Sequence, residues 1–289
     1  MSESGQPPTP LTWFITGTSA GLGRLIAEAA LDAGDTVVAT ARRPAELLDW
    51  AAERGSRLVV LDLDVTEPSG AARVIHEALA AVGRIDVLVN NAGRVHVGAV
   101  EEVTDEELKA LFDLHVFGPT RLLRAVLPHM RTRGSGTIVQ MSTMGSFFIT
   151  PGFSSYTASK AALDGLSATL AEEVSTFGIR ILIVQPGSHR TEIFSAASTA
   201  TELPAYAQVT GPMRRFLGTV DGAQPGDPSK AAQIVVDLVR SGRELPLRLP
   251  LGADAVANIG NAVDKVRRDV DEWADVARST AFADPSPST

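Results

Sequence analysis

The sequence predicts a doubly wound α/β fold, in which helices cover both faces of a mostly parallel sheet. Three observations lead to this prediction. Short apolar runs alternate with longer amphipathic segments along most of the chain. The apolar runs are continuous rather than interleaved with polar residues, as in strands buried on both faces. A glycine-rich turn also joins the first apolar run to the first amphipathic segment, as in folds built from repeated strand–helix units.

The strands are predicted where the apolar runs are shortest and most continuous. They are residues 11–16, 36–41, 58–63, 85–89, 137–141 and 179–184, with 245–249 as a further edge strand. Parallel strands need crossover connections, which in such folds are usually helices. The segments between these runs are therefore expected to be helical.

Helix start and stop signals support those helices. Thr104 and Glu107 have the spacing of a capping box, which starts a long helix predicted to run towards Met130. Asp227 is predicted to cap a later helix with Pro228 in its first turn. The other predicted helices are the segment that follows the glycine-rich turn and ends near Gly34, and residues 44–55, 68–83 and 155–178.

The predicted elements form one domain over residues 11–250. The chain has 289 residues, of which 44% are hydrophobic and 21% charged, so it can bury a core without metals or disulfides. Residues 1–10 are polar and proline-rich, and we expect a disordered leader there. Residues 188–226, rich in small residues and proline, lie where such folds carry a substrate-covering segment. Residues 251–289 form a C-terminal extension.

The extension is predicted to contain an amphipathic helix. Its apolar residues recur at steps of three and four, which places them on one helix face. Two interpretations remain open: the stripe docks on its own domain, which we favour, or it contacts a second subunit. The stripe consists of Val256, Ile259, Val263, Val266, Val270, Trp273 and Val276.

Composition excludes several classes of function. A net charge of −8 argues against nucleic acid as a partner, because phosphate binding needs a basic face. The chain has no cysteine, which excludes disulfides and cysteine-based metal sites. It shows no signal-peptide pattern and no apolar run of the ~18 residues that a membrane helix needs. We expect a cytoplasmic protein without a metal or membrane partner.

The glycine-rich turn has the features of a dinucleotide-binding loop. Glycines let the backbone turn sharply and approach a pyrophosphate, and the following helix start offers free N–H groups. The candidate cofactor-binding residues in this loop are Gly17, Thr18, Ser19, Gly21, Leu22 and Gly23.

The end of the second strand indicates which nicotinamide cofactor is preferred. NAD-specific sites commonly place an acidic residue there to bind the ribose 2′-hydroxyl. This chain instead has Arg42 and Arg43, and arginine forms charge-assisted hydrogen bonds with a 2′-phosphate. The sequence therefore predicts NADP(H), with NAD(H) as the less favoured alternative.

Further motifs follow the loop in a fixed order, and together they resemble the short-chain dehydrogenase/reductase family over roughly residues 11–250. The resemblance implies a Rossmann-type fold. It further implies that Asp64 and Val65 contact adenine and that Lys160 holds the nicotinamide ribose. The motifs are Thr16-Gly17-x-x-x-Gly21-x-Gly23, Asp64-Val65, Asn90-Asn91-Ala92-Gly93, Tyr156-x-x-x-Lys160, and Pro186-Gly187 with Thr191.

The same resemblance assigns two further parts of the site and an assembly. Asn91, Ala92 and Gly93 form the family's signature after the fourth strand. Pro186, Gly187 and Thr191 are expected beside the nicotinamide carboxamide. The family commonly forms dimers or tetramers through its long helices, so we expect a homo-oligomer.

Tyr156 and Lys160 are four residues apart on a predicted helix, so they share a face. A phenol titrates near 10 in water, and a neighbouring positive charge favours the phenolate. We therefore expect Lys160 to lower the pKa of Tyr156, which then acts as general acid in reduction and general base in oxidation.

Two positions depart from the family pattern. Thr143 stands where the family usually has a serine that hydrogen-bonds the substrate oxygen, and it keeps the hydroxyl; Ser142, one residue earlier, is the less favoured candidate. His115 stands where the family often has an asparagine that holds a proton-relay water. His115 is either a packed, hydrogen-bonded side chain, a substitute relay, or a sign of altered catalysis.

Apolar side chains flank the catalytic motifs, as in pockets for bulky apolar ligands. Their number indicates a hydrophobic carbonyl compound or secondary alcohol as the substrate. The candidate substrate contacts are His96, Met144, Phe148, Phe153, His189 and Phe194.

These features predict an NADP(H)-dependent ketone reductase or alcohol dehydrogenase that uses Tyr156, Lys160, Thr143 and His115. Two alternatives remain. His115 and Thr143 are also compatible with a cofactor-binding protein of weak or no redox activity. A non-redox enzyme on the same fold, such as a dehydratase or epimerase, is the other.

Overall fold

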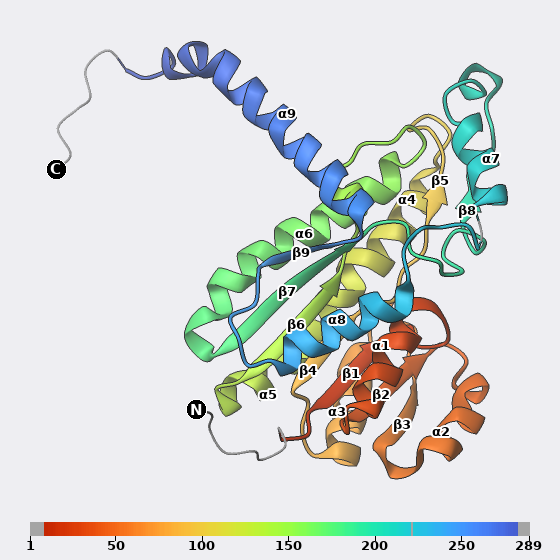
Figure 1. Ribbon diagram of the computed structural model, residues 1–289, viewed down its shortest axis with the longest axis vertical. Helices are drawn as coiled ribbons and strands as arrows, with labels where there is room; N and C mark the ends of the chain where they lie inside the picture. The colour runs from red at the N-terminus through yellow and green to blue at the C-terminus, as the bar shows by residue number, and fades with distance from the viewer. Residues whose placement is uncertain (1–8, 221, 283–289) are drawn as a thin grey trace.

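A seven-stranded parallel sheet forms the centre of the computed structural model, which describes residues 9–220 and 222–282 (Figure 1). The strand order is β3-β2-β1-β4-β6-β7-β9. Strands β2 and β3 are added on one side of β1, and β4 and the later strands are added on its other side, so the order of strand addition switches sides between β1 and β4. The predicted doubly wound α/β fold is confirmed. The strands are β1 Thr12–Thr16, β2 Thr36–Ala41, β3 Leu58–Asp62, β4 Val87–Asn90, β6 Gly136–Met141, β7 Ile179–Pro186 and β9 Arg248–Leu251.

Helices cover both faces of this sheet (Figure 1). α1 and α8 pack with α2 over one face, where Trp13, Ile26 and Val236 are fully buried. α3, α5 and α6 cover the other face, around Phe14 and Ile138. The helices are α1 Gly21–Asp32, α2 Leu48–Arg54, α3 Gly70–Val82, α4 Asp105–Phe112, α5 Gly118–Arg133, α6 Ser154–Val174, α7 Gly211–Thr219, α8 Pro228–Arg240 and α9 Ala253–Arg278.

The predicted capping residues act as expected. Thr104 and Glu107 form a complete capping box at the start of α4. The Asp227 carboxylate accepts hydrogen bonds from the backbone N–H groups of Ser229 and Lys230 at the start of α8. Both helices therefore begin where the sequence predicts, because each cap satisfies backbone donors that would otherwise lack partners.

The long helix predicted from Thr104 towards Met130 is interrupted, which corrects that prediction. α4 passes into a π-helical turn over Asp113–Phe117 before α5 begins at Gly118. A Cβ atom at Gly118 would lie 2.7 Å from the Val65 carbonyl oxygen, so the chain approaches the loop after β3 closely here. The extra residue of the wide turn changes the direction of the side chains around His115.

Several element boundaries also differ from the prediction. β4 covers Val87–Asn90 rather than 85–89, and β9 begins at Arg248 rather than at 245. The helix predicted to end at 178 ends at Val174 and continues as a short 3-10 turn. Such shifts are small, because the same apolar runs still supply the strands and helices.

The predicted substrate-covering segment, residues 188–226, contains structure of its own. It includes α7 and the short strand β8 (Ser198–Thr199), which pairs with β5 (His96–Val97). In Figure 1, β5, β8 and α7 lie together above one end of the central sheet. This end carries the carboxyl termini of the parallel strands, where ligands bind in open α/β sheets.

Helix α9 projects away from the rest of the molecule (Figure 1). Its predicted apolar stripe is largely exposed: Val266 is 62% and Trp273 60% accessible. The favoured prediction, that the stripe docks on its own domain, is therefore wrong. Within Ala253–Arg278, all of which the structure describes, Ala255 alone is buried.

Two further expectations concern the ends of the chain and membranes. Most of the predicted leader lies outside the described residues; Thr9 and Pro10 belong to no helix or strand. Over the described part of the chain, no helix combines the length and the apolar character that crossing a membrane requires.

Candidate active site

The loop between β1 and α1 is built to receive an anion. Gly17 and Gly21 have positive φ angles of 69° and 60°, which side chains strongly disfavour. The N–H groups of Gly17 and Thr18 donate to the Thr40 carbonyl and anchor the loop on β2. No side chain caps the first turn of α1, so its N–H groups and positive dipole end are available to a phosphate.

Gly23 and Asn91 hold this loop against the loop that follows β4. Asn91 donates from Nδ2 to the carbonyl oxygens of Thr16 and Gly17, at 2.9 and 3.1 Å. A Cβ atom at Gly23 would lie 2.3 Å from Asn91 Nδ2, which only glycine avoids. The backbone N–H groups of Asn91 and Ala92 both donate to Thr16 Oγ1. The two predicted motifs thus form one rigid unit.

The remaining loop residues surround this unit. Thr18 is buried, and its hydroxyl donates to the Thr40 carbonyl oxygen. Ser19 is exposed at the turn, and Leu22 is partly buried against the core. Gly93 lies against the ring of His115, 3.3 Å from Nε2 to its ideal Cβ position.

The two arginines after β2 differ in their surroundings. Arg43 forms an ion pair with Glu46, 3.0 Å from Nε to Oε1. Arg42 is exposed, and no ion pair of its guanidinium occurs within the described residues. A 2′-phosphate would therefore find Arg42 the more available of the two.

The Asp64-Val65 pair follows β3 at the same edge of the sheet. Asp64 Oδ1 accepts hydrogen bonds from the N–H and the hydroxyl of Thr66, at 2.9 and 2.7 Å. Val65 is buried. These bonds fix the direction of the Asp64 carboxylate.

The segment after β7 completes the predicted nicotinamide side. The methyl and Cβ atoms of Thr191 lie 3.8 and 3.7 Å from the ideal Cβ position of Gly21, so the chain brings Thr191 against the phosphate loop. Pro186 ends β7, and the N–H of Gly187 donates to the Leu251 carbonyl oxygen of the neighbouring strand.

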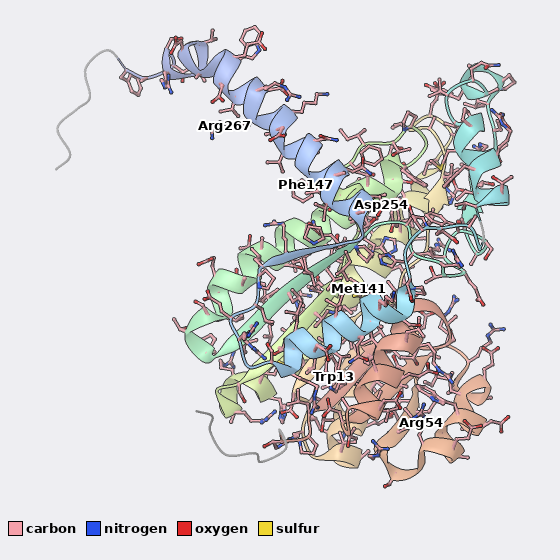
Figure 2. The ribbon with its side chains drawn as sticks, viewed as in Figure 1. Trp13, Arg54, Met141, Phe147, Asp254 and Arg267 are labelled. Carbon is pink, nitrogen blue, oxygen red and sulfur yellow. The ribbon has the colours of Figure 1, made fainter. Side chains whose placement is uncertain are left out.

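Asp254, at the base of α9, supports this segment, and sequence reasoning missed it. Its Oδ2 accepts a hydrogen bond of 2.7 Å from the N–H of Ser188. A Cβ atom at Gly187 would lie 2.1 Å from its Oδ1. Figure 2 shows Asp254 where α9 joins the body, above Met141 at the end of β6. No local sequence signal links residues so far apart.

Tyr156 and Thr143 meet at the carboxyl end of β6. Both side chains lie against Gly145, whose ideal Cβ position is 3.5 Å from Thr143 Oγ1 and 3.9 Å from Tyr156 Cε1. The Thr143 hydroxyl accepts from the N–H of Gly145, at 3.1 Å. Ser142 faces the other way, towards Asp164. The structure thus brings Thr143, and not Ser142, to the tyrosine.

Burial dominates the ionisation of the Tyr–Lys pair. It raises the pKa of Tyr156 to about 12, and the neighbouring Thr143 hydroxyl opposes that rise. The predicted lowering of the Tyr156 pKa by Lys160 is therefore not what the structure shows. Burial also lowers the pKa of Lys160 to about 8, against the opposing negative charge of Asp164.

Lys160 lies in a buried polar network. Its Nζ donates to the Met141 carbonyl oxygen at 2.8 Å. Asp164, one turn further along α6, accepts from Gln185 Nε2 at 2.7 Å, and burial raises its pKa. The Arg248 guanidinium lies 3.8 Å from the same carboxylate. Asp164 and Arg248 were also missed from sequence, because neither belongs to a recognised motif.

His115 is fully buried between the signature loop and α6. Its Nε2 accepts from the Arg94 N–H at 3.2 Å, and its Nδ1 lies 2.9 Å from Ser159 Oγ. Ser159 donates its own proton to the Tyr156 carbonyl oxygen, so Nδ1 carries the hydrogen of a neutral ring. Burial, with Lys160 and Arg94, lowers the pKa of His115 well below its ordinary value.

An apolar cluster surrounds Tyr156. It joins the tyrosine to residues of the substrate-covering segment and of the loop after β4. Phe153 lies 5.9 Å from the Tyr156 ring, centroid to centroid, and Phe194 packs against Phe216 at 6.1 Å. The cluster consists of Val95, Val97, Tyr156 and Leu217, with Phe153, Phe194, Ala197 and Met213 packed against them.

The other predicted substrate contacts lie in two different settings. Met144 begins a short 3-10 turn after β6, and its sulfur lies 3.7 Å from Asn258 Nδ2 of α9. Phe148 follows that turn and is 37% exposed. His96 is buried and bonds Ser198 Oγ through Nδ1 at 2.8 Å. His189 is buried, with Nδ1 3.2 Å from the Gly187 carbonyl oxygen.

A buried ion pair holds the substrate-covering segment in place. Glu102 accepts from the N–H groups of Ala99 and Leu203 and from Arg214 Nη2, at 2.8–2.9 Å. Arg214 also donates to the Ala200 carbonyl oxygen. Among the described residues, no three histidine, aspartate or glutamate side chains are grouped so that they could hold a metal ion.

Comparisons with known proteins agree with this arrangement. The family model described as short chain dehydrogenase matches residues 12–202. The oxidoreductase BOA17 of Botryotinia fuckeliana (strain B05.10) is 37% identical over 271 residues, covering 93% of this chain and 98% of that protein. The uncharacterized oxidoreductase YusZ of Bacillus subtilis (strain 168) is 32% identical, covering 83% of this chain and 88% of YusZ.

Solved structures give the same result. A short-chain dehydrogenase from Streptomyces avermitilis superposes with a TM-score of 0.89 at 49% identity, covering 95% of this chain and all of that chain. A metagenomic short-chain oxidoreductase in complex with NADP superposes with a TM-score of 0.68 at 26% identity, covering 85% of this chain and 98% of that chain.

Proposed function

Because the chain belongs to the short-chain dehydrogenase/reductase family and is an oxidoreductase, we propose that it transfers a hydride between NADP(H) and a hydrophobic carbonyl compound or secondary alcohol. One observation carries this proposal. Tyr156 is buried in an apolar cluster and lies with Thr143 against Gly145, with Lys160 one turn along the same helix. This arrangement suits proton transfer to an oxygen atom in an apolar pocket.

The residues present fit a nicotinamide dinucleotide. No side chain caps the start of α1, so its backbone N–H groups are available to a pyrophosphate. Gly23 has no room for a side chain, which keeps the loop close to Asn91. Asp64 would contact adenine, and Asn91, Ala92 and Gly93 would line the ribose side. When bound, the cofactor supplies or accepts the hydride; Pro186, Gly187 and Thr191 would lie beside its carboxamide, and Lys160 would hold its ribose.

Within this proposal, the protein's own groups handle the proton. Thr143 donates a hydrogen bond to the carbonyl oxygen and Tyr156 delivers its proton there; in oxidation Tyr156 takes the proton back. The high pKa of Tyr156, about 12, keeps the phenol protonated at neutral pH, which is the form that donates a proton in carbonyl reduction. Burial rather than Lys160 dominates the pKa of Tyr156, so Lys160 is proposed to act on the cofactor ribose.

His115 is proposed to shape the site rather than to pass protons. Both ring nitrogens already bond protein atoms, Arg94 N and Ser159 Oγ. Its ring also packs edge-on against Tyr156, with centroids 5.7 Å apart. Of the interpretations open from sequence, the packed, hydrogen-bonded side chain is the one these contacts favour.

The cofactor preference is proposed to be NADP(H) on the strength of Arg42. Its guanidinium is exposed at the end of β2, while Arg43 is paired with Glu46. The related metagenomic oxidoreductase was solved with NADP, which supports the same choice. The absence of cysteines suits a cytoplasmic, reducing environment, where we expect the protein to act.

We also expect a homo-oligomer. The outer faces of α5 and α6 form a shallow groove lined by apolar residues, among them Leu123, Leu127 and Leu166. Long helices with such faces are where the family's subunits commonly meet, which supports this expectation.

The decisive experiment compares NADPH and NADH oxidation against a panel of hydrophobic ketones and aldehydes, with product analysis. We expect turnover with NADPH. Arg42→Ala should raise KM for NADPH about tenfold or more, the loss expected for one hydrogen bond to a charged group, and leave KM for NADH unchanged. Arg43→Ala, the matched control, should have a smaller effect.

Tight NADPH binding without turnover on the whole panel would favour the non-redox cofactor-binding alternative instead. Product formation without any change in nicotinamide absorbance would point to a non-redox enzyme on this fold. Equal effects of both arginine substitutions would remove the specific role of Arg42.

A further inference from the structure

The apolar stripe of α9 lies in the open. Val256, Val263 and Val270 are 61%, 48% and 59% accessible, and Val266 and Trp273 are exposed to a similar degree. Figure 2 shows Arg267 on the projecting part of α9, well separated from Met141 in the body. A contiguous apolar surface of this kind marks an interaction site.

The spacing of the stripe identifies the shape of its partner. Val256, Val263 and Val270 are seven residues apart, and Ile259, Val266 and Trp273 form a second series offset by three. This is the a and d pattern of a heptad repeat, which packs against another helix by inserting side chains between those of the partner. A helix that docks on a flat protein surface does not need apolar residues that repeat every 3.5 positions on average.

Charge argues against a membrane surface as that partner. Among the residues of α9, six are acidic and four basic, a net charge of −2. Helices that lie on anionic membranes carry an excess of lysine and arginine on their polar face. Two of the four basic residues, Arg267 and Arg278, are also paired within the helix, with Asp271 and Asp275.

We propose that α9 pairs with α9 of a second copy of this chain, in antiparallel orientation. A heptad stripe complements its own copy, because each a and d side chain finds the same type of hole on an identical helix. With the exposed fractions above, covering the stripe removes on the order of 600 Å² from each copy, and twice that area reaches the lower limit of a specific interface. The proposal is independent of the proposed reaction.

The distribution of side-chain size determines the orientation. Trp273 lies towards the free end of α9, whereas Gly260 and Ala262 flank the stripe near the base. Parallel pairing would place tryptophan on tryptophan at one end and small residues on small residues at the other. The distance between the two helix axes would then differ along their length. Antiparallel pairing sets Trp273 opposite Val256 and Val263 opposite Val266, which keeps the separation even.

Such pairing has a consequence for the site. Two residues at the base of α9 contact the site. Asp254 accepts a hydrogen bond from the N–H of Ser188 and lies against Gly187. Asn258 contacts Met144. In the antiparallel dimer, Trp273 of each copy lies beside the base of the partner's α9. Association would therefore steady the segment expected beside the nicotinamide.

The absence of cysteine allows a direct test by disulfide cross-linking of the full-length chain. The double variant V256C/W273C, under mild oxidation, should form a covalent dimer. In the antiparallel pair, the cysteine at position 256 of one copy lies opposite the cysteine at position 273 of the other. V256C alone and W273C alone should remain largely uncross-linked. N261C/R268C, with both cysteines on the exposed polar face of α9, is the matched control and should not cross-link.

Cross-linking of V256C alone as efficiently as the double variant would show parallel pairing and overturn the antiparallel arrangement. If no stripe variant cross-links above the polar-face control, the pairing itself is overturned. In that case, protection of V256C from alkylation would indicate docking on the same chain, and free alkylation would indicate an unpaired helix.

A disulfide can trap two copies that meet only rarely, so cross-linking alone does not show a stable dimer. The molecular mass in solution is therefore the second measurement. Val266→Asp places a charge in the stripe and should halve the mass measured by light scattering. Asn261→Asp makes the same change of charge on the polar face and should leave the mass unchanged. An unchanged mass for Val266→Asp, together with no cross-linking of V256C/W273C above the polar-face control, would overturn the proposal.

Discussion

At the residue scale, the site depends on two ionisable groups, and burial has shifted the pKa of each. The apolar cluster around Tyr156 raises its pKa to about 12, and burial lowers that of Lys160 to about 8. Both shifts favour the uncharged form of each group, as desolvation must. The tyrosine is therefore prepared as a proton donor, and the lysine charge is present only below about pH 8.

The first prediction concerns Tyr156. Tyr156→Phe should reduce turnover by about 10²–10⁴-fold, the usual contribution of a general acid, while NADPH binding by fluorescence titration stays nearly unchanged. The chain has one other tyrosine, Tyr206, whose exposed hydroxyl donates to Glu101. Tyr206→Phe is therefore the matched control, and retained turnover in Tyr156→Phe would remove its catalytic role.

The second prediction concerns His115 and acid stability. Its pKa is held well below the ordinary value of 6.5, so below pH 6.5 the unfolded chain takes up a proton that the folded protein does not. Stability is therefore complete above that pH and falls as the pH decreases. Relative to His115→Gln, the wild type should lose about 1.4 kcal/mol more between pH 7.5 and 5.5.

Urea denaturation at the two pH values measures this difference directly. The comparison does not depend on how stable the variant is at pH 7.5, because only the change with pH is used. An equal pH dependence for both proteins would mean that His115 is charged, or exposed, in the folded state.

At the scale of elements, the substrate-covering segment depends on the buried contact between Glu102 and Arg214. Glu102 is buried before α4, and its two oxygens accept from Ala99, Leu203 and Arg214. Removing a partner from a buried charge costs more than the contact itself is worth. This contact couples α7 and β8 to the loop that follows β5.

The third prediction follows from that contact. Glu102→Ala should raise KM for the carbonyl substrate and speed proteolysis within residues 188–226, with little change in NADPH affinity. Glu101→Ala is the matched control, because its contact with Tyr206 is exposed. Equal proteolysis of the two variants would show that Glu102 does not hold the segment.

At the scale of the whole molecule, one buried carboxylate joins distant parts of the chain. Asp35 accepts from the N–H of Leu11 at 2.9 Å and from Trp13 Nε1 at 2.8 Å, and it pairs with Arg240 at the end of α8. The Asp35 side chain is fully buried. The start of β1, the turn before β2 and α8 therefore depend on one another.

The fourth prediction tests this dependence. Arg240→Met keeps the apolar stem but leaves the Asp35 charge buried and unpaired, which should cost about 3 kcal/mol. Arg243→Met changes an exposed arginine three residues away and should have little effect. Urea denaturation of both variants decides the matter, and equal stabilities would show that Asp35 does not need its partner.

The sequence by itself determined the order of the elements, the glycine-rich loop and the spacing of the Tyr–Lys pair. These features are local, because glycine torsions, helix caps and a four-residue spacing act within one element. Thr143 was also identifiable as a candidate, by counting thirteen residues back from Tyr156 in the family pattern.

Only the tertiary structure decided how distant elements act on one another. The π turn at His115, the support of Gly187 by Asp254 and the high pKa of Tyr156 each arise from residues far apart in sequence. The stripe on α9 was visible in the sequence, but its direction away from the body was not. An amphipathic pattern specifies that a helix has an apolar face, whereas packing decides what that face meets.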